Sequence, residues 1–263
     1  SLFETSSESA IVKKFEFGVD TQLFFDCSSN GNFGKQYIGA IHKSFNRWPE
    51  DPLQHEMTSS LSRYIFSEQA IQGKKFNLIS KPFAPAFKIA DVIYFTSLQD
   101  TYCFIDAPQE IQEEIQDWEL ENIENAEGKN RCSEESITVC FNSESGCDIQ
   151  VFEFQNKIVK EGKTFYFLSD SLMYAAIFSS KEVYDCNVKR LMLRADSLLN
   201  LYLRKSEMLF NKACTSTEVI STMQELKLKI SAFKDSSELG LIQDLFNELK
   251  MENGKQIEAC RIW

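Results

Sequence analysis

The chain has 263 residues, 43% hydrophobic and 25% charged, so it is long enough to bury a core of ordinary globular composition. Its formal net charge of −11 weighs against binding duplex nucleic acid or anionic membranes, because both are bound mainly through Lys and Arg. No stretch approaches the roughly 18 apolar residues that a bilayer-spanning helix needs. We therefore expect no duplex nucleic acid and no membrane among the binding partners.

The first part of the chain predicts mainly strands. Residues 11–17 and 21–27 are strand-like, and the Gly-Val-Asp at residues 18–20 favours a hairpin turn between them. Residues 160–163 (Lys-Glu-Gly-Lys) favour a second hairpin turn. Buried or half-buried strands are predicted at residues 75–80, 87–95, 101–105, 136–142, 148–159 and 163–168.

Two helices are predicted between these strands. Asp51 and Pro52 favour the first, because Asp caps a helix and Pro is tolerated at its first position. Its apolar face is expected at Leu53, Met57, Leu61 and Ile65.

The second helix begins at Pro108, and its apolar stripe is Ile111, Ile115 and Trp118. Its other faces are acidic, and the sequence predicts a loop within residues 122–135, because negative charge disfavours the last turn of a helix. A solvated helix face explains these carboxylates, and an acidic docking surface for a basic partner is the alternative. The candidate docking residues are Glu110, Glu113, Glu114 and Asp117.

Residues 172–178 are ambiguous between strand and helix, and everything from residue 181 onward predicts helix. One long helix covers residues 181–213, and two shorter helices follow, separated by a break at residues 234–236. The apolar stripe of the first short helix recurs at alternating spacings of four and three residues, which is typical of helix–helix packing. Either the long helix or a partner covers this stripe, and we expect the apolar C-terminal tail to insert into a neighbouring surface. The candidate partner-binding residues here are Val219, Met223, Leu226, Ile230, Phe233 and Trp263.

These elements predict an α+β fold, with a strand-rich head containing two helices and then an all-helical segment. We divide it into a mixed domain at residues 1–180 and a helical domain at residues 181–263. The acidity lies in the first, which holds 15 basic and 27 acidic residues, whereas the second holds 13 and 12.

The eight cysteines are expected to be reduced. The chain is too long to need disulfides for stability, no Asn-x-Ser/Thr sequon occurs, and several cysteines lie in apolar strand-like runs. This predicts a cytoplasmic or nuclear protein. The cysteines are Cys27, Cys103, Cys132, Cys140, Cys147, Cys186, Cys214 and Cys260.

No motif for catalysis or for a cofactor is evident. His42 and His55 are the only histidines, which limits general-base and metal-ligand chemistry. The cysteine spacings are too wide for a zinc knuckle, and residues 30–35 depart from the Walker phosphate-loop pattern. Residues 165–167 (Phe-Tyr-Phe) are better explained by core packing than by nucleic-acid stacking. The basic cluster Lys189, Arg190 and Arg194 is expected on the wet face of the long helix.

The sequence thus predicts a non-catalytic protein–protein interaction subunit or adaptor of an intracellular complex, with no cofactor and no metal. The expected partner is another protein, either a second copy or a different chain, bound through the C-terminal helices. Two alternatives stay open: a nucleic-acid-associated factor, and an enzyme using a Cys/His pair such as Cys27 or Cys103 with His42 or His55.

Overall fold

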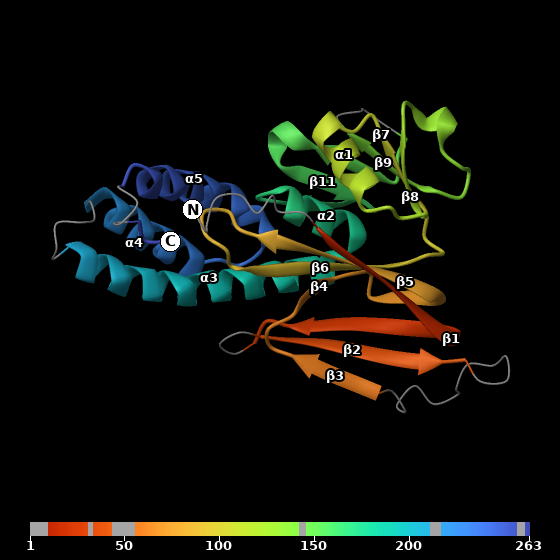
Figure 1. Cartoon of the computed structure of the whole chain (residues 1–263), viewed down its shortest axis with the longest axis horizontal. Coiled ribbons are helices and arrows are strands. Elements are labelled where there is room, and N and C mark those ends of the chain that lie inside the picture. The colour runs from red at the N-terminus through yellow and green to blue at the C-terminus, as the bar shows by residue number, and fades with distance from the viewer. Residues whose placement is uncertain (1–9, 31–33, 44–55, 142–145, 211–216, 257–260) are drawn as a thin grey trace.

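The fold is α+β, which confirms the predicted class (Figure 1). The computed structural model describes residues 10–30, 34–43, 56–141, 146–210, 217–256 and 261–263. Within these ranges the chain forms two six-stranded sheets and five α-helices, with the three longest helices following the strands.

The first sheet is antiparallel except for β4, which pairs in parallel with β6. One of its faces carries a cluster of its own, formed by Leu23, Phe25, Ile65, Ile71, Phe76 and Ile93. The amide of Phe25 donates to the carbonyl of Gln69 (2.9 Å), which extends the β1–β5 ladder by one residue. The strand order is β3 (Glu56–Ser60), β2 (Lys35–His42), β1 (Ile11–Ser28), β5 (Ala70–Phe83), β6 (Ala90–Ser97), β4 (Tyr64–Phe66).

The second sheet is mixed. Strands β8, β7, β9 and β10 are mutually parallel, whereas β10, β11 and β12 form an antiparallel meander. The helix α1 (Gln109–Asp117) supplies the crossover from β7 to β8 that parallel strands require. The predicted turn between β11 and β12 is confirmed, and both Glu161 and Gly162 have positive φ, as tight hairpin turns need. The strand order is β12 (Lys163–Tyr166), β11 (Lys157–Lys160), β10 (Ile149–Phe152), β9 (Ile137–Phe141), β7 (Tyr102–Ile105), β8 (Ile123–Ala126).

A short helix, α2 (Asp170–Phe178), lies between the two sheets (Figure 1). It contacts β4, β5 and β6 of the first sheet and β11 and β12 of the second. Eight of its nine residues are buried. A helix that is apolar on every side is stable only where it is covered on every side, and here both sheets cover it. This burial resolves the strand–helix ambiguity of residues 172–178.

Three C-terminal helices pack on one another and extend from the sheets (Figure 1). They are α3 (Lys181–Phe210), α4 (Thr217–Ser231) and α5 (Leu239–Gly254), with a 3-10 turn, η3 (Ser236–Glu238), at the predicted break. Their buried side chains belong to the same core as α2 and one face of each sheet. The core therefore continues across the proposed domain boundary at residue 180, which stays a prediction.

The hairpin predicted within residues 11–27 is wrong. These residues form the single strand β1, because both halves pair with β5, and the Gly-Val-Asp lies within an irregularity of that ladder between Glu16 and Thr21. A bulge absorbs the turn-forming residues without reversing the chain.

The helix predicted from Asp51 is also wrong from residue 56 onward, while residues 51–55 lie outside the described part of the chain. Strands β3 and β4 occupy its place, and all three residues of β4 are buried. An aromatic and β-branched run covered on both faces favours strand pairing over the four-residue periodicity. The two helices of the strand-rich head are therefore α1 and α2.

The predicted loop after α1 is partly wrong. Residues 123–126 form β8, and residues 129–131 form a 3-10 turn, η1 (Lys129–Arg131). Parallel pairing with β7 supplies backbone hydrogen bonds that the sequence pattern does not reveal.

The prediction of reduced cysteines is wrong for six of the eight. Disulfides join Cys27 to Cys186, Cys103 to Cys132 and Cys140 to Cys147, and the remaining two cysteines lie outside the described residues. The first bridge connects β1 with α3 across 159 positions, and the others lie at β7 and β9. Apolar flanking residues fit a buried thiol and a buried disulfide equally well, so they could not separate the two.

We predict that alkylation of the denatured, unreduced protein leaves these six cysteines unmodified, because disulfide sulfurs do not react with iodoacetamide. Peptide mapping by mass spectrometry measures this, and a reduced sample is the control in which all six are modified. Alkylation of Cys103 and Cys132 without reductant would contradict the second bridge.

Candidate functional site

The acidic face predicted for α1 is formed in part. Glu110, Glu113 and Asp117 are exposed, as the docking hypothesis requires. The helix presents them because Ile111 and Ile115 face the core, which turns the intervening positions outward. Three of the four predicted docking residues on α1 are therefore available to a partner.

The fourth, Glu114, is engaged inside the molecule. Its carboxylate pairs with Lys81 of β5 (2.7 Å) and accepts a hydrogen bond from the hydroxyl of Tyr174 in α2 (3.1 Å). Burial raises the pKa of the Tyr174 hydroxyl, and the neighbouring Glu114 raises it further. Glu114 thus connects α1 to the first sheet and to the central helix, and it is not part of the exposed docking surface.

A hollow of about 650 Å³ lies beside the exposed carboxylates. Its lining includes Phe154, whose side chain is 95% exposed. The sequence predicts one strand through residues 148–159, but β10 ends at Phe152 and a 3-10 turn, η2 (Glu153–Gln155), follows. This turn directs Phe154 into solvent, and nothing in the alternating sequence pattern distinguishes it from a core residue. The hollow is lined by Pro108, Gln109, Glu110, Glu113, Glu153 and Phe154, and below we call it the acidic hollow.

The predicted docking residues of α4 lie in the chain's own core. Val219, Met223 and Leu226 are fully buried, and Ile230 and Phe233 are nearly so. Helix α3 packs against α4, so the long helix covers the stripe, as one of the two sequence-based alternatives expects. Trp263 is half-buried and contacts the rings of Phe87 and Tyr202, so the C-terminal tail inserts into its own molecule.

A second hollow, of about 750 Å³, lies where the two sheets meet the start of α3. Charged side chains from both sheets line it, and we call it the charged cleft. Its ionisable residues are Glu68, Asp100, Asp148, Lys160, Glu161, Lys163 and Glu182.

The buried lysine of the charged cleft uses all of its hydrogen-bond donors within the molecule. Lys160 pairs with the carboxylate of Glu68 and donates to the carbonyl oxygens of Ile177 (3.0 Å) and Ser179 (3.1 Å). These carbonyls lie at the C-terminal end of α2, where a cation is favoured by the helix dipole. All three ammonium protons have acceptors, so Lys160 stabilises α2 and has no donor left for a ligand.

Asp100 is the perturbed acid of the cleft. Burial raises the pKa of its carboxyl above the usual range, the nearby Glu68 raises it further, and Lys160 acts in the opposite direction. Asp148 shows the reverse net effect. Burial pulls its pKa upward, but hydrogen bonds from the amide and hydroxyl of Thr138 outweigh burial and lower it. A raised and a lowered carboxyl in one cleft can occur in acid–base catalysis, but each shift here has a sufficient structural cause.

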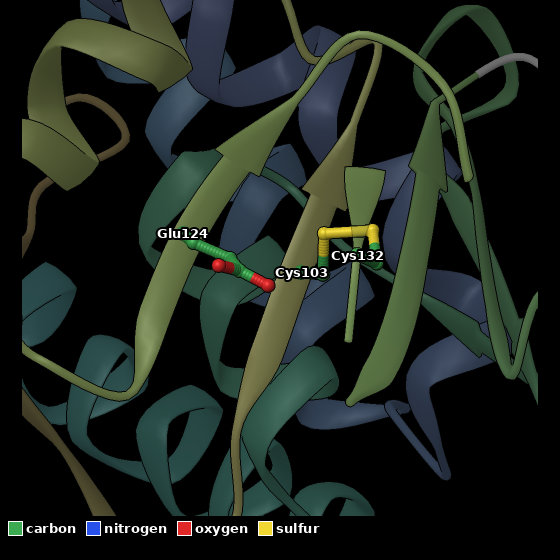
Figure 2. A group of neighbouring side chains, drawn as sticks. All are labelled: Cys103, Glu124 and Cys132. Atoms are coloured by element: carbon green, nitrogen blue, oxygen red, sulfur yellow. A yellow bond between two sulfur atoms is a disulfide. The ribbon is translucent and has the colours of Figure 1, made fainter. Parts of the chain in front are cut away.

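Cys103, Cys132 and Glu124 place their ligand-type atoms within 4.8 Å of one another (Figure 2). The two sulfurs are joined in a disulfide, so neither is a thiolate, and a disulfide is not the anionic ligand that zinc binds. The group therefore does not fit a metal site. The same bonding removes the thiols of Cys27 and Cys103, the two nucleophiles of the Cys/His enzyme alternative.

The remaining sequence candidates are structural where they are described. His42 lies within hydrogen-bonding distance of the Thr21 hydroxyl (2.9 Å), and His55 lies outside the described residues. Phe165 and Phe167 are buried, which confirms core packing for the aromatic run.

The basic cluster on α3 is the exception. Arg190 is fully buried, so the expected wet face is wrong at that position. Its guanidinium donates to backbone carbonyls at residues 60–63 that the sequence could not associate with α3.

Comparison with protein-family models, with curated proteins and with solved structures gives no significant match. None of the described helices combines the length and the hydropathy that crossing a membrane takes. The function is therefore inferred from the chain's own geometry.

We predict that Asp100→Asn stabilises the protein at pH 7 and that this gain disappears at acidic pH. The raised pKa means that the native fold prefers the protonated acid. Wild-type stability is therefore lost as pH rises from the usual carboxyl range through the raised pKa, and the neutral amide avoids that loss. Thermal unfolding across this pH range measures the effect. Glu161→Gln removes the same charge at an exposed acid lining the same cleft and is the matched control. A constant difference between Asp100→Asn and wild type at every pH would contradict the prediction.

Proposed function

We propose that this chain is a non-catalytic protein–protein interaction subunit that recognises a basic partner through the acidic hollow. The observation that supports this most directly is the almost complete exposure of Phe154 among carboxylates. An aromatic ring in water costs hydrophobic free energy, and covering a Phe side chain contributes about 1.5–3 kcal/mol. A partner that covers the ring gains this free energy.

The charge around the acidic hollow determines which kind of partner covers the Phe154 ring. Glu110 and Glu113 are exposed on the same edge of the hollow, and Glu153 precedes the exposed ring. Carboxylates at the rim of an interface accelerate encounter with a cationic surface and repel an anionic one. A Lys or Arg side chain also binds favourably over the face of a Phe ring. The proposed partner segment therefore carries basic residues next to an apolar side chain.

The structure of the C-terminal helices supports oligomerisation less well than their sequence pattern does. The stripe that was expected to meet a partner is buried in the core. Exposed apolar side chains on these helices are spread over all three, as Leu201 and Met208 on α3, Leu228 on α4, and Leu241 and Met251 on α5. Dispersed apolar residues of this kind are normal on a protein surface. The proposal therefore assigns recognition to the acidic hollow.

The disulfides change the cellular compartment that we expect for this protein. The cytoplasm or nucleus was expected because the cysteines were expected to be reduced, and three disulfides remove that support. Disulfides form and persist in oxidising compartments. We therefore propose that the complex assembles in such a compartment, and the alkylation experiment tests this premise.

No specific observation supports either alternative function. The aromatic run proposed for nucleic-acid stacking is buried at Phe165 and Phe167, and the thiols proposed for catalysis are paired.

We predict that two changes weaken binding of a cationic peptide in which Lys and Arg alternate with Leu. The charge reversal Glu110→Lys/Glu113→Lys should lower affinity about tenfold or more at low salt, mainly through slower association. Phe154→Ala should lower it about tenfold by removing the apolar anchor. Fluorescence anisotropy with the labelled peptide measures both, and a Glu-containing peptide of equal length is the negative probe.

The matched control is Glu207→Lys/Glu225→Lys, which makes the same change in net charge at two exposed positions of α3 and α4. If this control weakens binding as much as the reversal at α1, attraction is general rather than local, and the site assignment fails. Equal affinity of the wild type for the cationic and anionic peptides would reject the proposed partner chemistry.

A further inference from the structure

A hollow of about 510 Å³ lies where the β3–β4 loop and the starts of β4 and β6 approach α3. Two arginines line it, Arg63 from the loop and Arg194 from the helix. We call it the arginine hollow. Besides these two, its lining comprises Leu61, Ser62, Tyr64, Ser80, Ile89, Ala90, Asp91 and Ile93.

The loop that carries Arg63 is held in place by Arg190 of α3. The buried guanidinium of Arg190 donates to the carbonyl oxygens of Arg63 (2.8 Å), Leu61 (3.1 Å) and Ser60 (3.3 Å). It also lies over the ring of Tyr64, 4.9 Å from the centroid. Arg194 follows Arg190 by four residues on α3, so both project from the same side of the helix. Arg190 thus fixes the loop that carries Arg63, and α3 carries both Arg190 and Arg194.

Neither guanidinium has a counter-ion in the described part of the chain. No ion pair to the side chain of Arg63 or Arg194 is formed there, and the one carboxylate of the hollow, Asp91, pairs with Lys88 (2.7 Å). The two arginines are therefore available to an anionic ligand. They leave a local positive charge on an acidic protein.

A tyrosine accompanies the arginines. Tyr64 is 3% exposed and lines the hollow, and no described residue hydrogen-bonds to its hydroxyl. Arg190 lies over its ring, 4.9 Å from the centroid, and Arg194 lines the same hollow. Burial raises the pKa of the Tyr64 hydroxyl, and the positive charges of Arg190 and Arg194 act against that rise. The hydroxyl is therefore a neutral donor that lines the hollow together with Arg63 and Arg194.

The walls of the hollow are partly apolar. Ile89, Ala90 and Ile93 contribute aliphatic surface, and Ser62 and Ser80 contribute small polar groups. A few converging polar groups on an apolar lining, at this volume, are typical of sites for small organic molecules. A ligand of matching chemistry has an anionic head and an apolar body.

We propose that the arginine hollow binds a small organic phosphate monoester, whose phosphoryl group lies between Arg63 and Arg194 and whose apolar body lies against Ile89 and Ile93. Guanidinium groups bind phosphate oxygens with paired, charge-assisted hydrogen bonds. A phosphate monoester carries about −1.5 to −2 charges at pH 7, which two guanidinium groups can neutralise. A ligand whose head is a single carboxylate does not match the charge of the two guanidinium groups. The Tyr64 hydroxyl supplies a further donor.

Isothermal titration calorimetry with phenyl phosphate, inorganic phosphate and benzoate tests this site. We expect phenyl phosphate to bind most tightly, since it alone supplies both the dianionic head and the apolar body. Its affinity should fall below pH 6, because the phosphate then loses its second charge. Benzoate binding as tightly as phenyl phosphate would overturn the phosphate assignment, and no saturable binding of phenyl phosphate at millimolar concentration would overturn the site.

Three variants and one control locate the binding. Arg63→Ala and Arg194→Ala should each weaken phenyl phosphate about tenfold or more, and Tyr64→Phe should weaken it several-fold while keeping the ring. Arg204→Ala removes an exposed arginine from the same helix outside the hollow and should leave the affinity unchanged. Both arginines of the hollow are exposed, so the variants should fold, and unchanged thermal unfolding verifies this. Equal weakening by Arg204→Ala and Arg194→Ala would overturn the proposal.

Discussion

The burial of α2 between the two sheets is the constraint on which the rest of the structure depends. Tyr174 and Phe178 of this helix contact aromatic rings from β6, from β7 and from the end of α1. Aromatic pairs of this kind contribute through area and through ring geometry, so displacing one ring disturbs several neighbours. Because residues of both sheets and of α3–α5 share this core, the acidic hollow, the charged cleft and the arginine hollow are all built on it.

A buried helix needs partners for its terminal backbone groups, and the polar residues around α2 supply them. Lys160 accounts for carbonyls at the C-terminal end, and at the N-terminal end the amides of Leu172 and Met173 donate to the carbonyl of Ser169 (both 2.9 Å). The charged cleft is therefore best understood as the outer edge of the polar residues that support α2. This explains why perturbed carboxyls are concentrated there.

The sequence predicted the fold class, α1 and the C-terminal helices because each depends on local periodicity. The stripe from Val219 to Phe233 correctly indicated helix–helix packing, but periodicity does not say whether the covering helix belongs to the same molecule. The hairpin within residues 11–27 and the helix from Asp51 failed because strand pairing with β5 and β6 is non-local. Phe154 and Arg63 were missed for a related reason, since exposure and the absence of a counter-ion are properties of the assembled surface.

The disulfide between Cys27 and Cys186 closes a covalent ring that contains α2, the second sheet and the first sheet apart from most of β1. A protease that cuts one peptide bond anywhere in that ring leaves the two pieces joined through sulfur. A nicked molecule would therefore keep its mass and most of its core contacts until the bridge is reduced.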